Sequence, residues 1–403
     1  MRLARLSAAD WERIALVAVI IGAAIRAAWV LSLHPPLNYV HSDMGGYVDR
    51  AMKLASGGPL ERYDAFYPPG THWILAIPLA MWRFARHVLT VPAAAITAVL
   101  AAFWPINIIH SGYFLSETPA LALLVGSLWL SAGAARDRSL RDFIRSGLVG
   151  GLAVANRPAL AANLLVAALS SRRARLLATI GIGAGSAAVL ALVIAYNSLA
   201  AGRLTFLSEN SGLTMWLGQC GIRSVHLGDP SRGPYFEFVP PPALEKGTGR
   251  DVSIPDHAAW DQEYFYGLTL DCIRADGFAH LRTIARGIFD MTLTSTPWPE
   301  AEEQDLGPRI GFVNTMFSVA LPFIIAGGIW VARERRRRGE PAGELVMLGH
   351  FACVLVTALL FFGDPRFRET YDVFALSAAA GWFAYVFAEE HARAGETAPA
   401  SGG

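Results

Sequence analysis

The stretch Ile14–Leu33 reads IALVAVIIGAAIRAAWVLSL, with Arg26 as its one charged residue. A helix of about 20 mostly apolar residues is long enough to cross a bilayer, and it satisfies its own backbone hydrogen bonds in lipid. Arginines precede this stretch, and no Ala-x-Ala cleavage site follows it. We therefore expect a retained first membrane span rather than a cleaved signal peptide.

Similar apolar stretches recur along the chain. It has 403 residues, of which 53% are hydrophobic and 17% charged, and its mean hydropathy is +0.37. A water-soluble protein of this size would need more polar surface, so the composition predicts an all-α polytopic membrane protein with about ten transmembrane helices. These spans are expected near residues 14–33, 71–86, 89–108, 118–135, 144–156, 158–170, 176–196, 310–332, 345–362 and 371–388.

The basic residues predict the orientation of these spans. With the N-terminus inside, every clear arginine cluster falls on the cytoplasmic side, as the positive-inside rule requires. The clusters are Arg83 with Arg86, Arg136 to Arg145, Arg172 to Arg175, and Arg333 to Arg338. A single kinked span across the Arg157-Pro158 step would invert this topology downstream and would place the last cluster outside. We expect a multi-pass protein of the cytoplasmic (inner) membrane.

The predicted topology divides the chain into four parts. Residues 1–196 form an N-terminal transmembrane module, whose first outer loop (34–71) carries a surface helix from Gly45 to Ser56. Residues 197–307 are rich in Pro, Gly and acids and form a small outer, periplasmic insert, with one-sided apolar helices around Trp260–Leu268 and Ile273–Ile288. Residues 308–390 contain the C-terminal transmembrane helices, and 391–403 form a low-complexity disordered tail.

Two acids at the outer edge are candidates for chemistry. Asp43 precedes the predicted surface helix, and Glu117 opens a span in Ser116-Glu117-Thr118-Pro119. Both positions also suit helix capping and the positive end of a helix, so a purely structural role is an alternative for each. Ionisable groups at this depth are costly and usually face a cavity or a partner. We therefore expect the bundle to bring the two acids to one cavity.

Three arginines and two histidines occupy the same outer zone. Arg157, Arg366 and Arg368 lie where short loops normally lack positive charge, so they are candidates for binding an anionic head group through their guanidinium forks. Snorkelling at the interface is the alternative. His72 and His110 lack the spacing of a metal site, so we predict no metal ligands among them. No cofactor is certain, and a divalent cation is left open.

Taken in order, these residues resemble a membrane glycosyltransferase of the GT-C superfamily, in the bacterial branch related to protein O-mannosyltransferases and the lipid A aminoarabinose transferase. The resemblance covers most of the chain. It rests on Asp43, Tyr47, the Tyr67-Pro68-Pro69-Gly70 turn, Ser116-Glu117, Asn156-Arg157-Pro158 and Arg366-Phe367-Arg368. Many relatives have an acidic pair in the first loop, where this chain has Met44 after Asp43. The aminoarabinose enzyme has a lysine where this chain has Tyr67.

The resemblance implies transfer of a sugar from a polyprenyl-phosphate carrier to an acceptor outside the cytoplasmic membrane. Asp43 would be the catalytic base and Glu117 a second acid of the site, while Arg366, Arg368 and Arg157 would bind the donor phosphate. The substrate-binding candidates are Tyr47, Tyr67, His72 and His110. The expected partners are the polyprenyl-phosphate-linked sugar, a lipid, glycan or protein acceptor, and the bilayer, with no nucleic acid.

Two other functions fit parts of the pattern. A transporter or flippase of a lipid-linked anion would also use outer arginines, but such folds usually have internal repeats, and none is visible in the sequence. A ligase or polymerase of lipid-linked glycans would use the same carrier with a larger donor. The sequence lacks a Walker loop, a dinucleotide fingerprint and a Gly-x-Ser-x-Gly elbow, which argues against nucleotide-driven and hydrolase chemistry.

The cysteines give one further expectation. Cys220 and Cys272 both fall in the predicted outer insert, whereas Cys353 lies within a predicted span. An oxidising outer compartment would allow the first two to form a disulfide. Two separately buried thiols are the alternative, because free cysteine packs well in small apolar sites.

Overall fold

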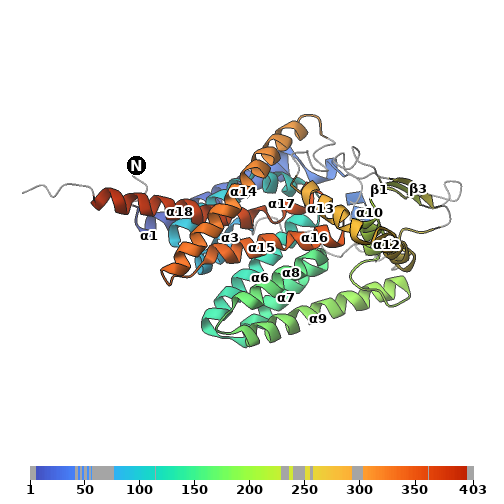
Figure 1. Cartoon of the computed structure of the whole chain (residues 1–403), viewed down its shortest axis with the longest axis horizontal. Coiled ribbons are helices and arrows are strands. Elements are labelled where there is room, and N and C mark those ends of the chain that lie inside the picture. Colours follow the sequence, from blue (N-terminus) through green and yellow to red (C-terminus); the bar gives the residue numbers. More distant parts are fainter. Residues whose placement is uncertain are drawn as a thin grey trace, which may run out of the picture.

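The computed structural model describes residues 6–40, 77–113, 115–227, 236–238, 250–254, 257–292, 303–361 and 363–396, together with 44–45, 48–49, 52–53 and 56. Most of the described chain is helical. Figure 1 shows an elongated bundle with the residues of the predicted insert at one end. The N-terminus and the end of the last helix lie at the opposite end.

The bundle helices follow the predicted spans closely. Their bounds are α1 Ala8–Ala28, α3 Ile77–Val88, α4 Val91–Phe103, α5 Pro105–Ile109, α6 Glu117–Asp137, α7 Leu140–Asn156, α8 Ala161–Ser170, α9 Arg175–Ala201, α14 Gly307–Arg337, α15 Gly343–Ala352, α16 Val354–Leu360, α17 Pro365–Glu369 and α18 Asp372–Glu396. A π-helical turn, Trp29–Leu33, continues α1. The break predicted at Arg157-Pro158 is present, because α7 ends at Asn156 and a 3₁₀ turn, Pro158–Leu160, precedes α8.

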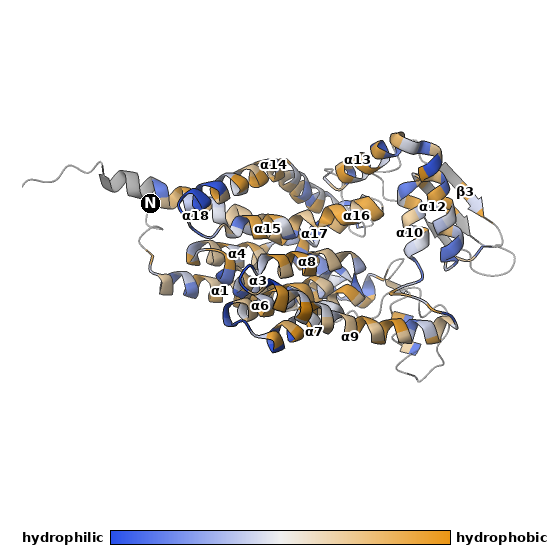
Figure 2. Cartoon of the chain, turned by 60° about the horizontal axis from the view of Figure 1, so that its bottom comes forward, coloured by the Kyte–Doolittle hydropathy of each residue, from blue (hydrophilic) through white to orange (hydrophobic). Residues whose placement is uncertain are grey.

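Among the described residues, fewer helices are long and apolar enough to span a membrane than the ten that the sequence predicts. Five are long and apolar enough to cross a membrane: Ala8–Leu33, Glu117–Asp137, Arg175–Ala201, Gly307–Arg337 and Gly343–Leu360. A sixth span results if the bent pair of α4 and α5, with a 50° break, counts as one. Hydrophobic residues make up much of α9, α14 and α15 (Figure 2), and several large ones of α9 and α14 are exposed. The chain therefore has the character of a multi-pass membrane protein, while the count of ten spans stays a prediction.

Small residues allow the helices of the bundle to approach closely. A Cβ atom at Gly147 of α7 would lie 2.4 Å from the carbonyl oxygen of Ile182, and one at Gly185 of α9 would lie 2.3 Å from that of Ile144. Both distances are far inside van der Waals contact, so only glycine fits at these crossings. Close approach through small residues is the usual basis of helix association in membranes, where burial of apolar surface supplies no net drive.

Arg26 compensates for the break between α4 and α5. Pro105 has no N–H, so the carbonyl of Ala101 loses the donor that a continuous helix would supply. The fully buried guanidinium of Arg26 donates to Ala101 O at 2.9 Å and to Ala102 O at 2.7 Å. This charged residue inside the first apolar stretch thus satisfies backbone groups that would be costly to leave unpaired in lipid.

The insert between α9 and α14 contains helices and a small sheet. Its helices are α10 Ser211–Gln219, α12 Gln262–Asp276 and α13 His280–Asp290, and its strands are β1 Ile222–Leu227, β2 Phe236–Phe238 and β3 Arg250–Ile254. Helices are present in both predicted stretches, but the second stretch is divided, since Ile273 belongs to α12 and a turn at Gly277–Ala279 precedes α13. The sheet, in the order β2-β1-β3 with β1 antiparallel to β2 and parallel to β3, was not predicted by an all-α assignment. Strands of three to six residues are too short to give a clear alternation in the sequence.

A core of its own and a disulfide stabilise the insert. Trp216, Val225 and Phe265 are buried together with other apolar side chains of α10, β1 and α12. Cys220 and Cys272 form a disulfide with their Cα atoms 5.7 Å apart, which confirms the pairing considered from the sequence. Cys353 is a buried free thiol.

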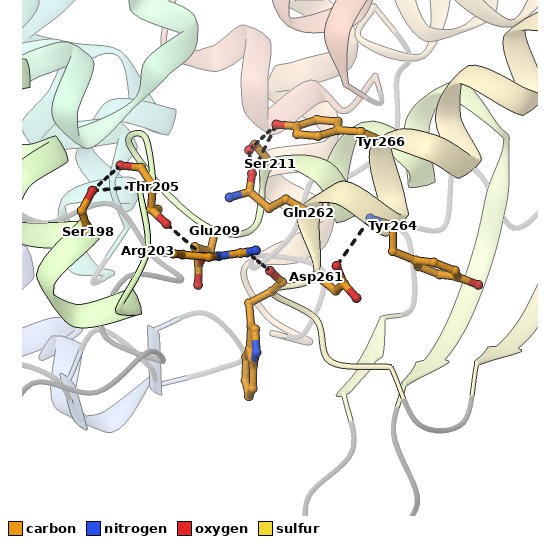
Figure 3. Close-up of polar contacts among 10 residues, drawn as sticks. Ser198, Arg203, Thr205, Glu209, Ser211, Asp261, Gln262, Tyr264 and Tyr266 are labelled. Carbon is orange, nitrogen blue, oxygen red and sulfur yellow. Dashed lines mark hydrogen bonds and ion pairs between the residues drawn. The ribbon is translucent and has the colours of Figure 1, made fainter.

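Hydrogen bonds at the end of α9 join the insert to the bundle (Figure 3). The Thr205 N–H donates to the Ser198 hydroxyl at 3.0 Å, and Thr205 and Arg203 both donate to the buried carboxylate of Glu209. Arg203 also donates to the carbonyl oxygen of Trp260 at 3.1 Å. The turn after α9 is thus connected on one side to the membrane helix and on the other to the start of α12.

Candidate functional site

Glu117 lies at the centre of the candidate site. It is the first residue of α6, follows the N-cap Ser116, and is 2% exposed. Pro119 suits the first turn of the helix, and a carboxylate is favoured at the positive helix end. A buried carboxylate without cationic partners would be unstable here, so its neighbours decide what the site can do.

Two arginines share one oxygen of this carboxylate. Arg157 Nη1 lies 2.6 Å from Glu117 Oε1, and Arg366 Nε donates to the same oxygen. Arg157 stands at the break between α7 and α8, where the following proline favours extended backbone. Its guanidinium also packs over the ring of Phe367, 4.9 Å from the centroid. Three of the sequence-predicted site residues, from three separate parts of the chain, are thus brought together.

Arg366 belongs to the short helix α17. Asp364 caps this helix, because its side chain accepts from the backbone N–H of Arg366 at 2.7 Å. The cap fixes the orientation of the first turn, and the side chain of Arg366 then extends towards α6. About an eighth of the Arg366 side chain and a tenth of the Arg157 side chain are exposed, whereas Glu117 is enclosed. The side chains of Arg157 and Arg366 are therefore the more accessible members of the cluster.

Arg368 occupies a different environment, although it lies only two residues further along. It is 1% exposed and donates to Asp372, to the carbonyl oxygen of Met291 and to Ser318 at 3.0–3.1 Å, and also to Asn314. A guanidinium has five N–H donors, and four of its hydrogen bonds in the described structure go to protein acceptors. Arg368 therefore joins α17, α14, α18 and the end of α13.

His110 contacts Glu369, the last residue of α17. Its Nε2 lies 3.2 Å from Glu369 Oε2, and both side chains are buried. His110 opens a 3₁₀ turn, His110–Gly112, between α5 and α6. This contact attaches the segment before α6 to α17, which carries Arg366. His110 is thus placed beside the candidate site, next to Glu369.

A second polar cluster was missed by the sequence analysis. His34 is buried, with Nδ1 3.0 Å from the carbonyl oxygen of Gly112 and Nε2 3.0 Å from Glu303 Oε1. The hydroxyl of Tyr113 donates to the same carboxylate. His34 also stacks on Tyr39 and Trp29. Since 269 residues separate His34 from Glu303, no local pattern could have revealed their contact.

Four predicted residues, Asp43, Tyr47, Tyr67 and His72, lie outside the described residues. The residue after Asp43 is described. Met44 is fully buried in an apolar cluster that includes Tyr113 and Leu115. Met44 is helical and directly precedes the predicted surface helix 45–56, of which only residues 45, 48–49, 52–53 and 56 are described.

The described residues also include one titratable group with a shifted pKa at the end of α13. Burial raises the pKa of Asp290 above its usual range, and Arg286 at 3.7 Å opposes this effect. Within the described parts of the chain, no group of three or more His, Cys, Asp or Glu side chains could hold a metal ion.

Comparison with known families confirms the resemblance to the GT-C superfamily over part of the chain. Residues 65–198 match the family model of dolichyl-phosphate-mannose-protein mannosyltransferase. This segment contains Glu117 and Arg157. No curated protein matches the chain.

Solved structures of one archaeal enzyme are similar at low identity. The oligosaccharyltransferase of Archaeoglobus fulgidus in complex with Zn and sulfate is 14% identical, with a TM-score of 0.47, over 93% of this chain and 50% of that one. The oligosaccharyltransferase AglB of the same organism, in complex with an inhibitory peptide and a dolichol-phosphate, is 14% identical, with a TM-score of 0.44, over 96% and 52%. The chain spans about half the length of these structures. TM-scores below 0.5 do not establish a common fold.

Proposed function

We propose that this chain is a GT-C-type glycosyltransferase that moves a sugar from a polyprenyl-phosphate carrier to an acceptor hydroxyl. The observation that carries the proposal is the buried carboxylate of Glu117 with Arg157 and Arg366 as its more accessible partners. Two members of this cluster fall within the segment that matches the mannosyltransferase family model. The family model supports the reaction class, and the cluster supports a donor site at Glu117, Arg157 and Arg366.

The chemistry of the cluster supports binding of a phosphate. Arg157 and Arg366 bring two positive charges to the single negative charge of Glu117. A guanidinium binds phosphate oxygens through paired N–H groups, and these charge-assisted bonds are about twice as strong as neutral ones. Glu117 holds the two forks close together before the donor arrives. This preorganisation reduces the cost of ordering them around the phosphate.

Asp43 is the proposed general base of the reaction. Its chain neighbour Met44 is buried against the segment that leads into Glu117, which supports a place for the first outer loop beside the donor site. In the transfer, the acceptor oxygen attacks the anomeric carbon, and its proton passes to the Asp43 carboxylate. The bond from this carbon to the phosphate oxygen breaks, and polyprenyl phosphate leaves. One displacement inverts the anomeric configuration and requires no nucleotide.

The arginines stabilise the departing group. Negative charge grows on the phosphate as the bond breaks, and fixed cations at that point lower the barrier. We assign this role to Arg366 and Arg157. Arg368 is assigned a positioning role instead, because its hydrogen bonds go to protein acceptors around α17. His110, Tyr47, Tyr67 and His72 remain proposed substrate-binding residues.

The remaining features of the proposal concern its setting. We propose the ten-span topology with the site on the outer, periplasmic side of the inner membrane, and residues 197–307 as the part that recognises the acceptor. The Cys220–Cys272 disulfide supports an oxidising compartment for the insert. The insert also touches α17, the helix that carries Arg366, since Met291 at the end of α13 accepts from Arg368.

A donor-turnover assay tests this function. The purified protein in nanodiscs would receive polyprenyl-phosphate mannose with a radiolabelled sugar, together with cell-envelope fractions as a source of acceptors. We expect release of polyprenyl phosphate and transfer of label, both strongly reduced in Arg366→Ala. Turnover of a nucleotide sugar without any lipid carrier would contradict the proposal. Transport of the intact lipid-linked sugar without bond cleavage would favour the flippase alternative.

A further inference from the structure

Among the described residues, no element covers one apolar face of helix α13, which lies next to a basic edge. Phe278, just before the helix, is 94% exposed, and Leu281 and Phe289 are each 62% exposed. These residues and the exposed Ala285 follow one another at three- and four-residue spacing, so they form one stripe along the helix. Exposed aromatic and aliphatic side chains in such a row mark a surface that contacts something other than water.

The opposite face of α13 packs on the bundle. The backbone of Gly287 approaches Gly363 so closely that a Cβ at Gly363 would lie 1.8 Å from the Gly287 carbonyl oxygen. Ile288 packs against the main apolar core, and the buried His280 contacts Gln219, whose amide donates to Leu359 O at 3.1 Å. The direction of the exposed stripe is therefore fixed by the rest of the fold.

The stripe lies where a candidate membrane span ends. Gly287 is near the carbonyl oxygen of Ala358, two residues before the end of the span Gly343–Leu360. The outward side of α16 is itself apolar and exposed at Leu355 and Leu359. Helix α13 lies beside α16 in the bundle (Figure 2). The apolar stripe therefore lies close to exposed apolar side chains at the end of a candidate span, where we place the boundary between hydrocarbon and head groups.

Charge identifies the class of lipid. Arg282 and Arg286 are exposed and follow the apolar stripe around the helix, at the edge where side chains would extend towards head groups. Asp290 is the one acidic residue of α13. It is buried and pairs with Arg286 at 3.7 Å. An amphipathic helix with basic residues beside its apolar face binds the interface of membranes that contain anionic lipids.

We propose that α13 is an interfacial helix that binds anionic phospholipid at the membrane surface on the insert side. The apolar stripe enters the acyl boundary, and Arg282 and Arg286 contact the anionic head groups. This inference does not depend on the proposed transferase activity. It also gives the insert a membrane contact close to Arg368. Met291, two residues after Phe289 of the apolar stripe, accepts a hydrogen bond from Arg368 through its carbonyl oxygen.

A quenching experiment on the full-length protein tests the proposal. A bimane probe on Ala285→Cys would be measured in phosphatidylcholine nanodiscs that contain a doxyl-labelled lipid at one fixed fraction. The labelled lipid would be either phosphatidylglycerol or phosphatidylcholine. A probe on Leu192→Cys, on the exposed side of the spanning helix α9, is the control for lipid contact. A probe on Arg274→Cys of α12, an exposed position of the insert, is the control for a polar surface.

We expect both lipids to quench the probe at residue 285, with preference for phosphatidylglycerol. Each arginine should contribute roughly a fivefold preference, the factor that corresponds to about 1 kcal/mol for one basic residue at an anionic surface. The variant Arg282→Gln/Arg286→Gln should lose the preference but keep the quenching, whereas the probe at 192 should respond equally to both lipids. Absence of quenching at 285, or equal quenching by both lipids in the unmodified helix, would overturn the proposal. A probe shielded from both lipid and aqueous iodide would instead indicate a protein partner.

Discussion

Arg366 donates a hydrogen bond to Glu117 across 249 residues of sequence, and Arg157 meets the same carboxylate oxygen at 2.6 Å. This contact joins the first turn of α6 to α17, next to the close approach of Gly287 and Gly363. A buried ion pair of this kind stabilises little overall, because desolvation offsets most of the attraction. Its value for the proposed function is that it holds two cations in place for an anionic ligand.

The first prediction concerns Glu117. Removal of one partner of a buried ion pair leaves an uncompensated charge, so Glu117→Ala should lower the free energy of unfolding by about 3–5 kcal/mol. The double variant Glu117→Ala/Arg157→Ala should lose less than the sum of the single variants, because the two residues share one interaction. Thermal and denaturant unfolding in detergent would measure both effects. Asp142→Ala, which breaks the exposed pair with Arg145, is the matched control and should change the stability far less than Glu117→Ala. Strict additivity at 117 and 157 would contradict the account.

The second prediction concerns Arg366. Loss of a hydrogen bond from a charged donor costs about 1.5–3 kcal/mol, so Arg366→Ala should weaken binding of polyprenyl phosphate by roughly 10- to 100-fold. Arg366→Lys should recover part of the affinity, since it restores the charge without the fork. Binding to the protein in nanodiscs can be followed by calorimetry. Unchanged affinity in Arg366→Ala would remove this residue from the donor site.

The third prediction separates Arg368 from Arg366. The sequence alone predicts that both arginines affect donor binding more than stability. The structure revises this for Arg368, because its removal would leave Asp372 and Asn314 without their buried partner. Arg368→Ala should therefore destabilise the fold by about 3–5 kcal/mol. An Arg368→Ala protein that keeps its melting temperature but loses donor affinity would restore the original assignment.

The fourth prediction concerns the disulfide of the insert. Cys220 and Cys272 close a loop with a sequence separation of 52. The chain-entropy model assigns such a loop roughly 3–4 kcal/mol, so Cys220→Ser/Cys272→Ser should open the insert more readily. Limited proteolysis within 197–307 should accelerate, while the bundle helices stay resistant. Cys353→Ser is the control, since this thiol is not bridged. Equal proteolysis of the oxidised protein and the double variant would contradict the prediction.

The sequence predicted the helices of this protein better than its contacts. Apolar stretches predicted 118–135 and 176–196, which lie within α6 and α9, and Pro158 predicted the break after α7. These features depend on residues close together in the chain. The short strands of the insert gave too little periodicity to be recognised.

The candidate site could be predicted only in part. Glu117, Arg157 and Arg366 stood out as charged residues at unfavourable depths, because burial of each requires a partner. Which charge meets which depends on how the helices pack, and the same holds for His34 and Glu303. Likewise, Arg366 and Arg368 share a motif in the sequence, but the short helix α17 directs one towards α6 and the other into the core.

The central claim is that Asp43 accepts the proton of the attacking hydroxyl, and turnover by Asp43→Asn tests it most directly. The measurement compares sugar transfer from polyprenyl-phosphate mannose by the wild-type protein, Asp43→Asn and the control Asp49→Asn, an exposed acid on the same segment. Loss of a general base should lower the transfer rate at least about a hundredfold. The account predicts this loss for Asp43→Asn alone, with wild-type folding and donor binding. Near-normal turnover together with a lowered melting temperature would contradict it and would identify Asp43 as a helix cap.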